Sequence, residues 1–200
     1  MAIDRPPSSS PSTASVDLFW IPLGAGNRLV RGNGIIYEWL CAKRAHRSPL
    51  AVFHAAIVVG LGGAQYTIEV APVPDRFGAR RGVVATGPVG TRALARLRWF
   101  RYEVRCWADG VIPDLGASVA SPVRVSTCPE TARRVLDVLP WVPTFVWGRD
   151  ELATGDPWTC NSVVSWTLAS AGVDPTVIPL PPNARAPGWH AGCEVASRSA

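Results

Sequence analysis

Residues 52–70, VFHAAIVVGLGGAQYTIEV, contain the feature that decides the fold. Two apolar runs, 52–59 and 64–70, lie on either side of the glycine-rich segment 60–63. Apolar runs of this length, rich in β-branched residues and separated by glycines, are typical of a β-hairpin. The sequence therefore predicts two antiparallel strands joined by a tight turn.

The hairpin carries a histidine and a glutamate within its apolar strands. A turn centred between Leu61 and Gly62 sets His54 opposite Glu69 on one face, with Cβ atoms about 4.5 to 5.5 Å apart. A carboxylate at this distance can hold an imidazole in one tautomer and stabilise its protonated form. The alternative is a histidine that only packs in the core, with Glu69 bonded to it or to an arginine.

Further elements are expected on both sides of the hairpin. The patterns predict strands over 17–23 and 99–107, a helical turn over 92–97, and helices over 35–45, 129–139 and 160–171. The proline-rich segment from Pro179 onward is expected to be irregular. We therefore predict an α+β fold, in which an antiparallel sheet with the histidine-bearing hairpin packs against a C-terminal helix. A Pro/Ser-rich tail, 1–15, precedes the single domain, 16–200.

Cys160 is the candidate nucleophile. It lies in the segment 156–164, DPWTCNSVV, where Asp156 or Thr159 can cap a helix and place Cys160 in its first turn. Backbone N–H groups and the helix dipole at this position lower the pKa of a thiol and can hold an oxyanion. Ser162 is the rival nucleophile, although its hydroxyl would point to another side of the helix. Cys160 could equally serve as a small buried apolar residue.

The order of these motifs resembles the circularly permuted branch of the papain-like, NlpC-type cysteine hydrolases, to which the YaeF/YiiX group and lecithin:retinol acyltransferase are related. The motifs are FHAAIVV at 53–59, YTIEV at 66–70 and WTCNS at 158–162. By this resemblance the fold is permuted papain-like, Cys160 is the nucleophile, His54 the general base and Glu69 the residue that orients His54. The resemblance implies a thiol-dependent hydrolase or acyltransferase that acts on a cell-wall-type peptide or a lipid or acyl substrate, without a cofactor.

Arginine supplies almost all of the positive charge, because Lys43 is the only lysine and the net charge is +5. We define the arginine belt as the region Arg76–Arg105, in which aromatic residues alternate with eight arginines: Arg76, Arg80, Arg81, Arg92, Arg96, Arg98, Arg101 and Arg105. Such a belt favours contact with an anionic surface. The alternative to such contact is a solvated strand or loop face on which the arginine stems cover apolar surface. The alternative to an enzyme is a non-catalytic binding module that uses the belt for an anionic partner. Sequence-specific nucleic-acid binding is not expected, since no known readout motif accompanies the belt.

Other classes of protein fit the sequence poorly. No apolar stretch approaches the roughly 18 to 20 residues of a membrane span. The first fifteen residues lack the apolar core of a signal peptide, so we expect a cytoplasmic protein, with signal-free export left open. Five cysteines without a C-x-x-C pair predict neither a disulfide framework nor a zinc site.

Overall fold

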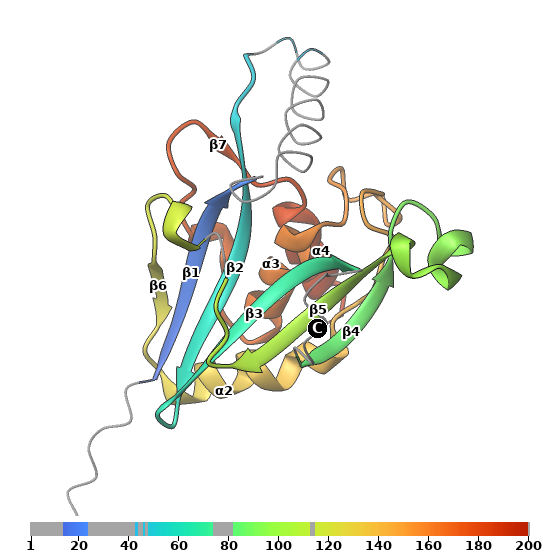
Figure 1. Ribbon diagram of the computed structural model, residues 1–200. Coiled ribbons are helices and arrows are strands. Elements are labelled where there is room, and N and C mark those ends of the chain that lie inside the picture. Colours follow the sequence, from blue (N-terminus) through green and yellow to red (C-terminus); the bar gives the residue numbers. More distant parts are fainter. Residues whose placement is uncertain are drawn as a thin grey trace, which may run out of the picture.

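The computed structural model describes residues 14–23, 43, 46, 48–73, 82–112 and 115–199. Within these ranges the strands form one sheet in the order β4-β5-β3-β2-β1-β6, with β7 beside β2 (Figure 1). The strands are β1 Ser15–Pro22, β2 Ala51–Leu61, β3 Ala64–Val73, β4 Val83–Pro88, β5 Arg101–Ala108, β6 Val123–Ser126 and β7 Ala184–Arg185. All neighbours are antiparallel except the short β2–β7 pair.

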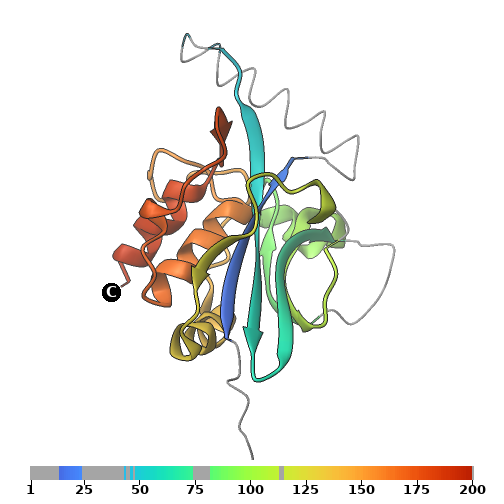
Figure 2. The same cartoon turned by 90° about the vertical axis from the view of Figure 1, so that its left-hand side faces the viewer.

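Helices cover one face of this sheet, as the side view in Figure 2 shows. They are α2 Pro129–Val138, α3 Cys160–Ser170 and α4 Trp189–Ser197. The 3-10 turns lie at several places around the sheet: η1 Arg92–Arg96, η2 Arg98–Phe100, η3 Leu115–Ala117, η4 Leu139–Trp141 and η5 Pro175–Val177. In the described part of the chain, none of the helices is both long and apolar enough to cross a bilayer. The fold is therefore a mixed α+β sheet with a helical layer on one side.

The alternation of β2 separates two apolar clusters. Phe53, Ala55 and Ile57 belong to the main core, which α2, α3 and α4 complete from one side. Ala56 points the other way, into a smaller cluster that also contains Ile21 and Ile112. Successive residues of a strand face opposite sides of a sheet. Each face of β2 is therefore occupied, but only one of them contacts the helices.

The hairpin forms as predicted, but its register differs from the expected one. Gly62 and Gly63 both have positive φ, 63° and 83°, and make a two-residue turn that leaves Leu61 paired with Ala64. The turn centre thus lies one residue further along than predicted. The expectation that His54 faces Glu69 directly is wrong, because this shift displaces every cross-strand partner by two residues.

The two strands of the hairpin also separate. Their pairing runs from Leu61 and Ala64 only as far as Ile57 and Ile68, while β3 continues along β5. Figure 1 shows β2 and β3 diverging beyond this point. One edge of β2 is therefore free of β3 over the residues that precede Ile57.

The remaining predictions fare unevenly. The helices over 129–139 and 160–171 and the strand over 17–23 are confirmed within a few residues. The predicted helix over 35–45 and the tail over 1–15 lie almost wholly outside the described residues. The prediction of an irregular segment from Pro179 onward holds over 179–188 apart from the short β7, but it is wrong from Trp189, where α4 buries apolar residues against α3. The prolines precede this helix and do not interrupt it.

Candidate functional site

The first turn of α3 is built by a capping box. The hydroxyl of Thr159 accepts a hydrogen bond from the N–H of Asn161 at 3.1 Å, and the Thr159 N–H donates to the hydroxyl of Ser162 at 2.9 Å. This reciprocal pair satisfies two N–H groups that a helix start leaves without partners. Of the two candidate caps, Thr159 is the one that caps the helix, and the prediction that Cys160 lies in its first turn is confirmed.

Asn161 fastens this helix start to β2. Its Oδ1 accepts from the Ala55 N–H at 2.7 Å, and its Nδ2 donates to the carbonyl oxygens of Phe53 at 3.0 Å and Pro187 at 2.9 Å. Phe53 and Ala55 lie in the part of β2 that β3 has left, and β7 pairs with β2 just beyond, at Val52. The Asn161 side chain thus makes the two hydrogen bonds with β2 that a neighbouring strand would otherwise make at Phe53 and Ala55. We call this set of three bonds the Asn161 clamp.

The clamp brackets His54, since it binds the backbone of the residues before and after it. The alternation of β2 places the His54 side chain with Ala56, on the face away from α3. Its neighbour on β1 is Ile21, which belongs to the smaller cluster. The structure therefore brings the start of α3 to the backbone around His54, but the imidazole leaves the strand on the other face.

Glu69 lies on the same sheet face as His54. It follows Ile68, whose side chain points into the main core, and its partner on the neighbouring strand β5 is Arg105. Arg105 is only 4% exposed and forms an ion pair of 2.7 Å with Glu103. The prediction that His54 and Glu69 share a face therefore holds, and the ion pair of Glu103 and Arg105 lies on the same face, which sequence reasoning missed. The alternation of RYEVRCW, 101–107, was the available signal, because it sets Glu103 and Arg105 on one side.

The thiol of Cys160 is buried and protonated at neutral pH. The residue is 8% exposed, and its Sγ lies 3.9 Å from Oδ1 of Asn161. Burial raises the pKa of this thiol to about 12, although the N–H groups of Asn161, Cys160 and Ala55 act in the opposite direction. The expectation of a lowered pKa is wrong here, because desolvation outweighs the effect of the helix start.

Ser162 has a structural task. It is fully buried, and its hydroxyl donates to the Gly188 carbonyl oxygen at 2.7 Å while accepting from Thr159. Both directions of its hydrogen bonding are therefore used by the backbone around α3 and α4. This arrangement leaves Ser162 poorly suited to attack a substrate.

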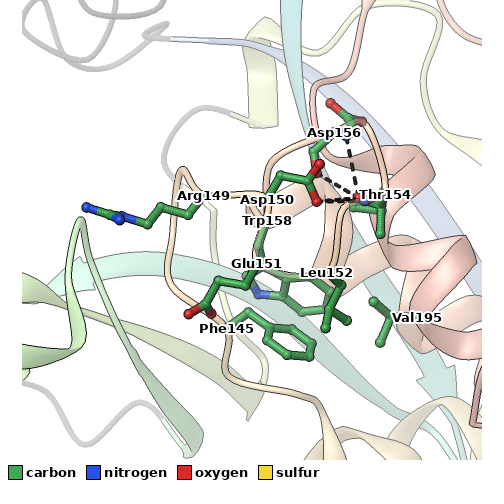
Figure 3. A pocket seen from close by; sticks show the side chains of 10 residues that line it. Phe145, Arg149, Asp150, Glu151, Leu152, Thr154, Asp156, Trp158 and Val195 are labelled. Atoms are coloured by element: carbon green, nitrogen blue, oxygen red, sulfur yellow. Dashed lines mark hydrogen bonds between the residues drawn. The ribbon is translucent and has the colours of Figure 1, made fainter.

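Two pockets accompany the helical layer. The one in Figure 3 is bordered by Trp158 and by a loop that Asp150 closes through bonds to Thr154, and its volume of about 10 Å³ is at the scale of one water. The other, about 700 Å³, includes Trp166 and Cys193 among its lining residues. Neither is lined by a predicted site residue.

Histidine, cysteine, aspartate and glutamate form no group of three that could hold a metal ion among the residues with described coordinates. Comparison with known proteins gives no family to which the chain can be assigned: no family model, no curated protein and no solved structure matches it.

Proposed function

We propose that this protein is a thiol-dependent hydrolase or acyltransferase in which Cys160 attacks an amide or ester carbonyl. The observation that carries the proposal is the Asn161 clamp, which fixes the start of α3 on the backbone around His54. A permuted papain-like enzyme requires this order, with a histidine strand first and a cysteine at a later helix start. Glu69 shares the sheet face of His54 and would orient its imidazole on that face, before the imidazole moves to the sulfur.

Because the Cys160 thiol is protonated at neutral pH, a general base must remove its proton during the attack. With a pKa of about 12 the Cys160 thiol holds its proton at neutral pH. His54 would take this proton as the bond from Sγ to the carbonyl carbon forms, and would then give it to the leaving amine or alcohol. The acyl group is left as a thioester on Cys160. Water or another acceptor attacks the thioester and loses a proton to His54. His54 then returns this proton to the departing sulfur, and the Cys160 thiol is regenerated.

This reaction makes two structural demands. The His54 imidazole must move from the opposite face of the sheet, past the edge of β2 that Asn161 covers beside Ala55, to reach the sulfur. The substrate must also uncover Cys160, because only 8% of that residue is exposed. The backbone N–H of Cys160 would then be available to the developing oxyanion, whereas the N–H of Asn161 is bonded to the Thr159 hydroxyl.

The test is turnover of a panel of acyl esters and short peptidoglycan-like peptides. Cys160→Ala should abolish turnover, while Cys193→Ala, which removes a half-buried thiol on α4, should retain it. His54→Asn should reduce kcat by about 100-fold or more, and Glu69→Gln should have a smaller effect. With a turned-over ester, mass spectrometry should find the acyl group on Cys160.

Retained activity in Cys160→Ala would refute the assignment, and its loss in Ser162→Ala alone would move the nucleophile to Ser162. A wild-type protein that turns over none of these substrates while binding an anionic partner would instead favour the non-catalytic binding module.

A further inference from the structure

A projecting segment between β4 and β5 carries exposed apolar side chains. It consists of η1 and η2, none of whose residues is buried, and it forms the green coils at the β4 edge of the sheet in Figure 1. Leu94, Leu97 and Trp99 are 39%, 53% and 74% exposed. We call residues 92–99 the tip. Three large apolar side chains gathered within six residues of a projecting turn are typical of an interaction surface.

The structure sorts the arginine belt into inner and outer members. Arg105 is buried in its ion pair with Glu103, and Arg101 donates to the carbonyl oxygens of Ala95 and Arg96. Arg101 thus joins β5 to the turn η1, whereas the charge of Arg105 is matched within β5. The predicted belt was therefore too broad as an outward-facing surface, and its members Arg76, Arg80 and Arg81 lie outside the described residues.

The outward charge of the tip comes from Arg96 and Arg98. Both are exposed, and neither forms an ion pair within the described part of the chain. Glu151, which contacts the tip, is matched by Arg92 at 2.9 Å, so it does not offset these two charges. The tip therefore combines two unmatched guanidinium groups with three exposed apolar side chains.

We propose that the tip docks on the surface of an anionic phospholipid bilayer. Trp99 and Leu97 would enter the interface at headgroup depth, where tryptophan is favoured, while Arg96 and Arg98 contact lipid phosphates. A lipid surface fits the tip better than nucleic acid, because a phosphate backbone alone would leave Leu94 and Leu97 in water. With so few anchoring groups the contact is reversible and weakens with salt.

The inference goes beyond the proposed function and does not depend on Cys160. The tip is separated from that residue along the chain and is not part of the Asn161 clamp. Cys160→Ala should consequently bind vesicles as the wild type does. Loss of turnover and loss of lipid binding are thus separable results.

The experiment is co-sedimentation of the full chain with vesicles of phosphatidylcholine alone or mixed with phosphatidylglycerol, at low and high salt. Binding is expected only to the mixed vesicles and should weaken at high salt. Because each arginine near an anionic surface contributes about 5-fold in affinity, Arg96→Gln with Arg98→Gln should weaken binding about 30-fold. Trp99→Ser should also weaken it at unchanged charge.

Two matched controls remove the same groups elsewhere on the surface. Arg133→Gln with Arg134→Gln takes two exposed charges from α2, and Trp141→Ala removes a tryptophan that is 80% exposed. Both should bind within about two-fold of the wild type, as expected for residues outside the contact. The proposal is overturned if the controls weaken binding as much as the tip variants do. It is also overturned if the wild-type protein does not bind anionic vesicles. Tighter binding to duplex DNA than to these vesicles, lost in the Arg96 and Arg98 variant, would overturn it as well.

Discussion

Replacing Asn161 with alanine should destabilise the protein far more than the loss of one polar side chain usually does. The side chain is 2% exposed and makes the three bonds of the clamp. Each buried hydrogen bond contributes about 1 kcal/mol, and the Ala55 N–H left without a partner adds about 1 to 3 kcal/mol. We therefore expect the free energy of unfolding to fall by about 4 to 6 kcal/mol.

The matched control is Thr167→Val on the same helix. Thr167 is also fully buried, but its hydroxyl donates only within α3, to the carbonyl oxygen of Val163 at 2.7 Å. The Thr167→Val substitution should lower the free energy of unfolding by about 1 kcal/mol. Urea titrations followed by circular dichroism give both values, and hydrogen exchange should show faster exchange of the Ala55 amide in Asn161→Ala. Equal losses in the two variants would refute the clamp as the attachment of α3 to β2.

Three further outcomes follow from burial and packing. Brief treatment with iodoacetamide and peptide mapping should find the exposed Cys128 modified before the buried Cys160; the reverse order would contradict the burial of Cys160. Burial raises the pKa of Cys160 from 9.0 and that of Tyr102 from 10.0, each to about 12, so both stay protonated longer in the folded state. Stability should thus be fully retained below pH 9, fall between about pH 9 and 12, and fall less steeply in Cys160→Ala, as urea midpoints against pH would show. Gly192→Ala sets a Cβ 2.2 Å from a carbonyl oxygen of α3 and should lower stability by about 1 to 3 kcal/mol, whereas Gly116→Ala, with nothing within 4 Å, should leave the melting temperature almost unchanged.

Local patterns were sufficient for the elements, whereas the register of the hairpin was predicted one residue away from its true turn centre. The hairpin and the start of α3 follow from alternation, glycine content and the cap at Thr159, which are properties of neighbouring residues. The register depends on which glycines adopt positive φ, and here Gly62 and Gly63 do so. A turn centre that moves by one residue changes the partner of His54. The adjacent Gly62 and Gly63 were the available signal for this centre, because a two-residue turn with positive φ at both positions favours Gly-Gly.

The residues of the candidate site could be chosen from the sequence, but their burial and the pKa of Cys160 could not. The sequence indicates that Cys160 begins a helix, which favours a lower pKa, whereas the raised pKa comes from neighbours distant in the chain. The sequence likewise predicts Arg105 as part of a charged surface, whereas the pairing of β5 with β3 buries it. The α4 helix did have a local signal, the four-residue spacing of Ala191 and Val195, which the preceding prolines obscured.

The order of elements along the chain has a consequence for biosynthesis. Strands β1 to β5 are made first, and the helices that cover their apolar face follow later. Ala55 and Asn161, which join the two layers, are 106 residues apart. At about 5 to 20 residues per second, a ribosome needs roughly 5 to 20 s to cross that interval. For this time the nascent sheet presents Phe53 and Ile57 to water, and it is then that chaperones and other nascent chains compete with α3 for the same surface.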